Sequence, residues 1–264
     1  MNKSTHLLIL FSIATSMLPA QTDSILQAYQ AVTFTSESGT QLPYRVLWPK
    51  EYESTIDQNY PLVLFLHGAG ERGDDNKKQL IHGSSLFLQQ QDNFPAIVVV
   101  PQCATADYWA QMEQTEDGRV FNFGERPNPS LSAVMELLEL LLAKERIDQD
   151  RVYLMGLSMG GMGTFELLAR RPKTFAAAIP ICGGTNPALL PIYAKNVPLW
   201  IFHGAEDAVV KVQQSRRVVD ELKRLGFPPQ YTEYPDVNHN SWDRAFAEED
   251  LLRWLFSNKR QANK

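Results

Sequence analysis

Short apolar runs, rich in β-branched residues, alternate along this chain with segments of helical periodicity. Runs that are apolar throughout are typical of strands buried on both faces of a sheet. An alternation of such strands with helices builds a mostly parallel sheet that is covered by helices on both faces. The pattern therefore predicts an α/β fold around one central sheet.

The expected elements follow from these runs. Residues 31–34 and 44–48 are expected to form an opening hairpin, and buried strands follow at 62–66, 97–100, 152–155, 176–181, 199–202 and 231–234. Helices are expected at 131–146, 162–171, 215–225 and 242–256. The sheet is thus predicted to have eight strands.

No linker segment interrupts this alternation of expected strands and helices. The chain has 264 residues, of which 44% are hydrophobic, so it can build one large core, and disorder is excluded as its main state. A single domain is expected over 21–257, followed by a polar, frayed tail over 258–264.

The first twenty residues are interpreted separately from the fold. Lys3 precedes an apolar stretch at 7–13, and Ala20 stands just before the polar Gln21. This pattern is typical of a cleavable signal peptide over 1–20, although Leu18 leaves the exact cut open. A buried helix or a membrane anchor fits less well, because the stretch is short and no second basic flank follows it. We therefore expect a secreted or periplasmic protein with no integral membrane segment after cleavage.

Charge and side-chain spacing exclude several classes of ligand. The formal net charge is -5 with both signs interspersed, so no basic face is expected for a nucleic acid. Cys103 and Cys182 are far apart, and no pair of histidines has the spacing of metal ligands, so no metal is expected. No phosphate-binding glycine motif opens the helix after residue 155. The sequence implies no cofactor.

The motif that carries most information is Gly-x-Ser-x-Gly at 156–160. It lies between the strand expected at 152–155 and the next helix. In this setting the glycines permit a strained turn that lifts the serine hydroxyl out of the sheet, which makes Ser158 the candidate nucleophile. The alternative is a turn that serves only close helix packing.

A serine nucleophile needs a base and an acid that orients the base. On this type of scaffold the chain order is serine, acid, histidine. His239 is the last histidine and lies in a loop after the last strand, whereas Asp207 follows the strand at 199–202. Glu206 is the competing acid. We predict a catalytic triad of Ser158, Asp207 and His239.

Two further groups of residues complete the predicted site. The backbone N–H groups of Met159 and Ala69 are the expected oxyanion donors, with Gly70 as an alternative to Ala69. Gly70 is also a possible substrate-binding residue. His67 and His203 each precede a glycine at a strand end, where an imidazole commonly holds loop backbone by hydrogen bonds.

Together these segments resemble the α/β-hydrolases. The matching stretches are His67-Gly-Ala-Gly-Glu-Arg-Gly, Pro101-Gln-Cys, Gly156-Leu-Ser-Met-Gly-Gly, Ile181-Cys-Gly-Gly, His203-Gly-Ala-Glu-Asp and His239-Asn-Ser-Trp. Over about residues 40–257 the chain is similar to compact secreted carboxylesterases, which are related to dienelactone hydrolases, polyhydroxybutyrate depolymerases and the prolyl oligopeptidase catalytic domain. Dienelactone hydrolases use a cysteine nucleophile, so their lactone chemistry is not implied here.

The resemblance implies a strand order of 1-2-4-3-5-6-7-8. In that order the strand before Cys103 and the strand before Cys182 are three steps apart, which is too far for a disulfide. Two free thiols are therefore expected, even in an oxidising compartment.

The connection at 183–198 is too short for a large lid, so we expect an open site. The longer connection at 104–129 carries Tyr108, Trp109, Phe121 and Phe123, which either line a substrate pocket or pack the loop onto the sheet. Trp242 is expected to shape the alcohol side or to anchor the last helix. The predicted substrate is a small-molecule or polymer-borne ester, and the oligomeric state is left open. A serine peptidase and a non-catalytic binding protein are the alternatives.

Overall fold

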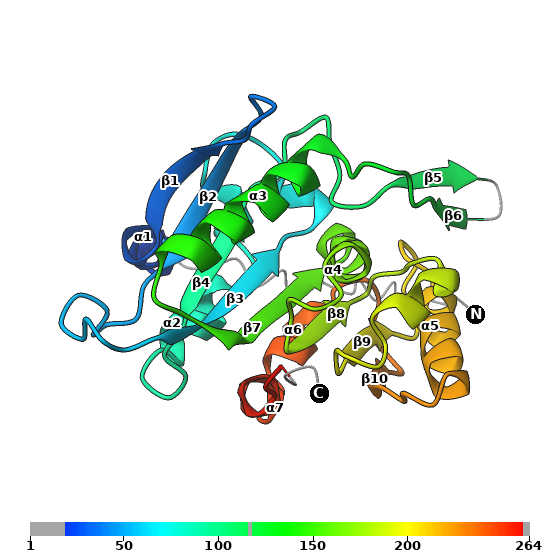
Figure 1. Ribbon diagram of the computed structural model, residues 1–264. Helices are drawn as coiled ribbons and strands as arrows, with labels where there is room; N and C mark the ends of the chain where they lie inside the picture. Colours follow the sequence, from blue (N-terminus) through cyan, green and yellow to red (C-terminus); the bar gives the residue numbers. More distant parts are fainter. Residues whose placement is uncertain (1–18, 116–117, 261–264) are drawn as a thin grey trace, which may run out of the picture.

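The computed structural model describes residues 19–115 and 118–260 of the chain (Figure 1). Its centre is an eight-stranded sheet with the order β1-β2-β4-β3-β7-β8-β9-β10. The strands are β1 Gln30–Thr35, β2 Gln41–Leu47, β3 Tyr60–Leu66, β4 Ile97–Pro101, β7 Ile147–Leu157, β8 Ala177–Ile181, β9 Trp200–Gly204 and β10 Gln230–Tyr234. β2 runs antiparallel to both β1 and β4, and the remaining pairs are parallel. The predicted fold class, strand number and strand order are confirmed.

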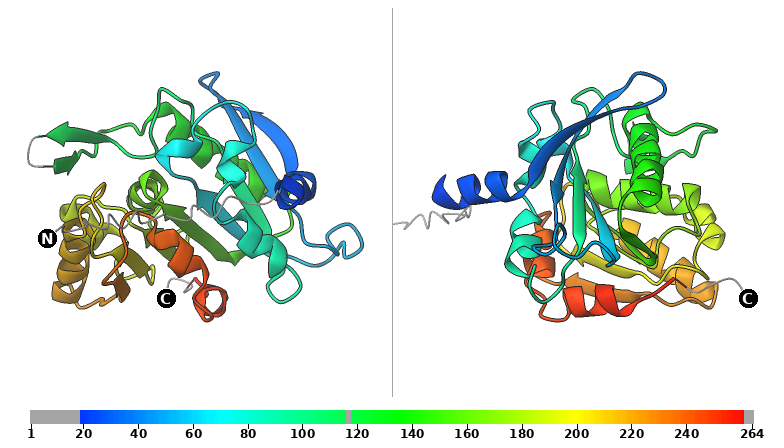
Figure 2. Two further views of the ribbon diagram at one scale, coloured as in Figure 1. Left: turned by 180° about the vertical axis from the view of Figure 1, so that it is seen from behind. Right: turned by 60° about the vertical axis from the view of Figure 1, so that its left-hand side comes forward.

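Both faces of the sheet are buried, which explains the continuous apolar runs in the sequence. Along β3, Leu62, Leu64 and Leu66 face one core, whereas Val63 and Phe65 face the other. The first core is closed by α3 Pro129–Lys144, α4 Met159–Arg170 and α5 Gln213–Arg224. The second is closed by α1 Pro19–Ala28, α2 Ser84–Gln89, α6 Ser241–Phe246 and α7 Leu251–Ser257 (Figure 2).

The last predicted helix, 242–256, is wrong as a single element. The structure has two helices there, α6 and α7, separated by residues 247–250. The break contains an acidic run that ends at Asp250, and aspartate favours the start of a helix over its interior. The turn allows Ala245 and Leu251 to be buried in the same core.

Several elements escaped the sequence analysis because they are short. They are α1, α2, three short 3-10 helices and a separate hairpin of β5 Met112–Thr115 and β6 Gly118–Phe121, which projects from the connection between β4 and α3 (Figure 1). One 3-10 helix, η3 Pro187–Ile192, lies in the short connection between β8 and β9, where no large lid was expected and none is seen among the described residues.

The chain ends were expected to be a signal peptide and a frayed tail. Residues 1–18 and 261–264 lie outside the described residues, and α1 spans the point where a cut after Ala20 was expected. Asn258 and Arg260 are held to the domain, because the Asn258 side chain donates to the Trp254 carbonyl at 2.7 Å and the Arg260 N–H donates to the Asp150 carbonyl at 2.8 Å. The expected fraying therefore does not extend to this part of the tail.

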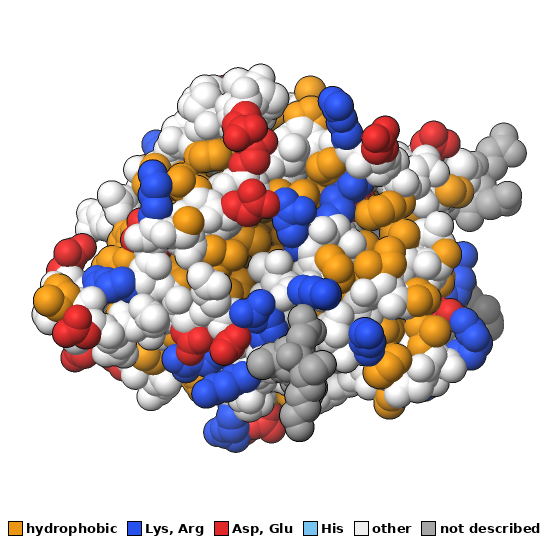
Figure 3. All heavy atoms as spheres, viewed as in Figure 1, with side chains coloured by type: hydrophobic (Ala, Val, Ile, Leu, Met, Phe, Trp, Pro, Cys, Tyr) orange, Lys and Arg blue, Asp and Glu red, His pale blue; other side chains and the backbone are white. Residues whose placement is uncertain are grey.

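No helix in the described part of the chain is long and apolar enough to cross a membrane. The surface in Figure 3 shows acidic, basic and apolar side chains scattered together, and neither sign of charge dominates it.

Cys103 and Cys182 are both free and fully buried, as predicted. Burial raises the pKa of the Cys103 thiol to about 12 and also raises the pKa of the Cys182 thiol. Neither thiol is therefore ionised at neutral pH.

Candidate active site

Ser158 occupies the strained turn between β7 and α4. Its backbone has φ 53° and ψ -115°, and its N–H donates to the Ile181 carbonyl at 2.8 Å. Backbone packing around the turn is very close: a Cβ on Gly160 would lie 1.9 Å from the Leu66 carbonyl oxygen, and one on Gly156 would lie 2.3 Å from the Gly160 carbonyl oxygen. The two glycines of the motif are thus required by contact between α4 and the sheet, while the strain falls on the serine.

The structure brings Ser158, His239 and Asp207 together at the carboxyl ends of β7, β10 and β9. Ser158 Oγ lies 2.9 Å from His239 Nε2, and His239 Nδ1 lies 2.7 Å from Asp207 Oδ2. The Asp207 side chain is fully buried, whereas 20% of the His239 side chain is exposed. Glu206, the competing acid, is exposed and makes no contact with His239 among the bonds of the described residues. The arrangement can pass a proton from the hydroxyl to the imidazole.

Asp207 is held as a carboxylate by more than His239. Burial alone raises its pKa, but hydrogen bonds from His203, His239 and the Val210 N–H more than offset this and hold the pKa below its usual range. His203 Nε2 lies 3.3 Å from Asp207 Oδ2, and the Val209 and Val210 N–H groups each donate to Oδ1 at 2.8 Å. The carboxylate is therefore ionised at neutral pH and fixed in orientation.

His203 has the structural role that its position predicted. Its Nε2 donates to the Val210 carbonyl at 2.8 Å, so its Nδ1 accepts from the Ser215 hydroxyl at 2.7 Å. The same Nε2 faces Asp207. Sequence reasoning found the loop contact but missed that His203 also supports the acid.

The loop after β3 is held in place by hydrogen bonds of His67 and its neighbours. His67 Nδ1 donates to the Gly68 carbonyl at 2.6 Å, and its Nε2 accepts from the Cys103 N–H at 2.9 Å. Trp109 Nε1 donates to the His67 carbonyl at 3.0 Å, and Arg72 Nε donates to the Ala69 carbonyl at 3.0 Å. The loop is therefore fixed before any ligand arrives.

Met159 and Ala69, the predicted oxyanion donors, occupy equivalent positions in their elements. Met159 is the first residue of α4, and Ala69 is the first residue of the 3-10 helix Ala69–Glu71. The N–H groups at the start of a helix have no acceptor within that helix. Neither N–H group has an acceptor within its own helix, as the predicted role of an oxyanion donor requires.

Buried His67 makes the fold sensitive to acid. Burial lowers the pKa of His67 to about 4, from 6.5. Protonation would also break the hydrogen bond that its Nε2 accepts from the Cys103 N–H. Between these values the unfolded chain binds a proton that the folded chain does not, so this contribution to stability is complete above about pH 6.5 and is lost as the pH falls towards 4. We expect the free energy of unfolding to fall by up to about 3 kcal/mol because of His67. Urea unfolding of the wild type and of His67→Gln at several pH values measures this contribution. Between about pH 4 and 6.5, the free energy of unfolding should change less steeply with pH in the variant than in the wild type. Equal slopes would contradict the assignment of this pH dependence to His67.

The predicted pocket residues divide into two groups. Gly70 is exposed, with open space around it, and Trp242 stands beside the base with its ring 5.3 Å from that of His239. Tyr108 is half-buried, with the Arg72 guanidinium 4.5 Å above its ring. Trp109 is fully buried against His67, so its prediction as a pocket residue is wrong. Its ring packs the loop onto the sheet, because the indole N–H has its acceptor there.

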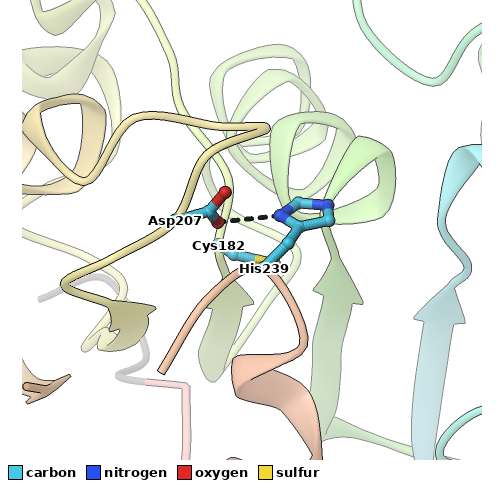
Figure 4. Close-up of side chains that lie close together, drawn as sticks. All are labelled: Cys182, Asp207 and His239. Atoms are coloured by element: carbon cyan, nitrogen blue, oxygen red, sulfur yellow. Dashed lines mark hydrogen bonds and ion pairs between the residues drawn. The ribbon is translucent and has the colours of Figure 1, made fainter. Parts of the chain in front are cut away.

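Cys182 adjoins Asp207 and His239, a neighbourhood that the sequence analysis did not predict. It follows β8 with φ 40°, and its sulfur, the Asp207 carboxylate and a His239 ring nitrogen lie within 4.8 Å of one another (Figure 4). A metal would need a thiolate, whereas burial raises the pKa of this thiol, and His239 and Asp207 already bond to each other. The group fits a metal poorly, and the thiol packs beneath the imidazole.

Comparisons with known proteins identify the family of this chain. The sequence profile of the Esterase family, described as "Putative esterase", matches residues 35–230, a segment that contains Ser158 and Asp207 and ends before His239. A solved structure, described as a thermostable esterase, superimposes with a TM-score of 0.80 at 36% identity, covering 90% of this chain and 64% of that one.

Two curated relatives add to this comparison. The bifunctional acetylxylan esterase/xylanase XynS20E of Neocallimastix patriciarum is 30% identical over 61% of this chain, and the chain spans 21% of that protein. Carboxylesterase SOBER1 of Arabidopsis thaliana is 25% identical over 67% of this chain and 82% of its own length. The matched family profile, together with the α/β-hydrolase fold, shows that this chain belongs to the Esterase family.

Proposed function

We propose that this protein is a serine hydrolase that cleaves carboxylic esters. The observation that carries the proposal is the hydrogen-bonded series of Ser158, His239 and Asp207, which leads from the serine hydroxyl through a partly exposed imidazole to a fully buried carboxylate. Membership of the Esterase family supports it, as do relatives described as an acetylxylan esterase and a carboxylesterase.

In this proposal each residue has its own step. His239 Nε2 takes the proton from Ser158 Oγ as the oxygen attacks the ester carbonyl carbon, and the C=O π electrons move to the carbonyl oxygen. The N–H groups of Met159 and Ala69 stabilise that oxyanion. Asp207 holds Nδ1–H and stabilises the imidazolium. His239 then gives its proton to the departing alkoxide, which leaves an acyl-enzyme, and water activated by the same imidazole releases the acid.

The test is covalent labelling by a fluorophosphonate probe. The wild type should be labelled, and Ser158→Ala should not, because the probe reacts only with an activated serine. Unlabelled wild type would contradict the triad and would favour a binding protein. Labelling that persists in Ser158→Ala would place the nucleophile elsewhere.

Rates on 4-nitrophenyl acetate and on the matching 4-nitroanilide separate an esterase from a peptidase. A faster anilide than ester would overturn the proposal in favour of a peptidase. A series of 4-nitrophenyl esters of rising chain length, with methyl ferulate and acetylated xylan beside it, would identify the acyl group. Export to the periplasm or outside the cell belongs to this proposal as well, on the pattern of residues 1–20.

A further inference from the structure

Arg119 stands out because two nitrogen atoms of its guanidinium group lack a hydrogen-bond partner in the part of the chain that the structure describes. Its Nε and Nη1 atoms are buried and have no hydrogen-bond partner, and no ion pair joins it to a carboxylate among the described residues. A guanidinium is always charged, and leaving such a group buried and unpaired is costly. A surface arginine would instead keep its donors in water.

The position of Arg119 in β6 directs its side chain towards the domain. Side chains alternate along a strand, so Arg119 and Phe121 share one face and Val120 lies on the other. Val120 is 48% exposed, whereas Phe121 is buried against Met162 of α4 and Val210. Arg119 is therefore on the face of the hairpin that packs against the molecule.

The same contacts place Arg119 close to the triad. Gln214 Nε2 donates to the Arg119 carbonyl at 3.3 Å. A Cβ on Gly184 would lie 2.9 Å from Gln214 Cβ and 3.0 Å from the Phe121 ring, and Gly184 is two residues after Cys182. The charge of Arg119 is also near enough to lower the pKa of the Cys182 thiol, although burial outweighs this effect. Cys182 in turn adjoins Asp207 and His239.

From this placement we infer that Arg119 binds a carboxylate on the substrate, so that the enzyme prefers esters that carry a free acid group. The planar guanidinium presents adjacent N–H donors that match the two oxygens of a carboxylate. The inference rests on the proposed function. The acid group can belong to the acyl part or to the alcohol part of the ester, and the experiment distinguishes these two sources.

The experiment measures kcat/KM for pairs of substrates that differ in the acid group. The acyl pair is 4-nitrophenyl hemiglutarate and 4-nitrophenyl pentanoate, and the alcohol pair is 4-carboxyphenyl butyrate and phenyl butyrate. For each pair, kcat/KM of the charged substrate is divided by kcat/KM of the neutral one. This ratio is compared among the wild type, Arg119→Met, Arg119→Lys and Arg126→Met. Arg126 is an exposed arginine on the same connection, so its variant controls for the change in net charge.

In one of the two pairs, the ratio should fall about 10-fold to 100-fold in Arg119→Met, which corresponds to the loss of a charge-assisted bidentate contact. Arg119→Lys should restore part of the ratio, and Arg126→Met should keep it. Because each ratio is taken within one variant, partial misfolding cancels. An unchanged ratio in both pairs, or an equal fall in Arg126→Met, would overturn the inference while leaving the esterase proposal intact.

If the wild type cleaves no ester of either pair, the proposed function fails, and binding decides the role of Arg119. Calorimetric titration of Ser158→Ala should show heat of binding for monomethyl glutarate, which carries a free acid group, and none for methyl pentanoate. In the double variant Ser158→Ala with Arg119→Met, the heat for monomethyl glutarate should disappear. Equal binding of the acid with and without Arg119 would refute the inference.

Discussion

Replacing Ser158 with alanine should lower kcat for 4-nitrophenyl acetate by about 10⁴-fold or more. The loss is large because the hydroxyl is the group that forms the covalent bond, and His239 Nε2, 2.9 Å away, then has no proton to accept. Initial rates of purified wild type and variant, at equal concentration and with saturating substrate, measure the effect. A rate within 10-fold of the wild type would contradict the assignment of the nucleophile.

The matched control is Ser257→Ala, an exposed serine near the end of α7 whose hydroxyl donates to the Trp254 carbonyl. It should keep the wild-type rate. The double variant Ser158→Ala with His239→Ala should lose no more activity than Ser158→Ala alone, since residues that act as one unit are not additive. A further large loss in the double variant would mean that His239 acts independently of Ser158.

Replacing Gly160 with alanine should lower the free energy of unfolding by about 3 kcal/mol or more. A Cβ at this position would lie 1.9 Å from the Leu66 carbonyl oxygen and 2.8 Å from the His67 carbonyl oxygen, which are backbone atoms of β3 and of the loop that follows it. Neither can move without separating α4 from the sheet. Urea unfolding followed by circular dichroism measures the change.

Gly70→Ala is the matched control for stability, because a Cβ there meets nothing within 4 Å and Gly70 is not among the glycines with positive φ. Its free energy of unfolding should stay within about 0.5 kcal/mol of the wild type. If Gly160→Ala proved as stable as Gly70→Ala, the close contact between α4 and β3 would be wrong.

The central strands of the sheet were predictable because they are buried on both faces. Burial on both sides makes β3 and β4 apolar at every position, which separates them from amphipathic helices. The triad was predictable for a related reason: in a parallel sheet the carboxyl ends meet at one edge, so residues after β7, β9 and β10 are brought together. Ser158 and Asp207 each follow such a strand.

Residues whose role depends on a neighbouring loop were less predictable. Trp109 and Phe123 are both aromatic residues of one connection, yet Trp109 is fully buried and 37% of Phe123 is exposed. The hairpin of β5 and β6 is too short to leave a clear pattern, so nothing in the sequence indicated that Arg119 faces the molecule. The break between α6 and α7 was missed because the apolar residues on either side of the acidic run keep helical spacing.

By itself the sequence determined the fold class, the order of the strands through the resemblance that it carries, and the choice of Ser158, Asp207 and His239 as the candidate triad. These follow from local chemistry, because periodicity and glycine placement act within a few residues. Only the tertiary structure decided that Asp207 is supported by His203 and that Cys182 adjoins Asp207 and His239. It also decided that two buried nitrogen atoms of Arg119 have no hydrogen-bond partner among the described residues. Cys182 and Arg119 lie far in sequence from Asp207 and His239, so no local pattern records their positions. His203 and Asp207 are only four residues apart, but the sequence does not show how the loop between them folds.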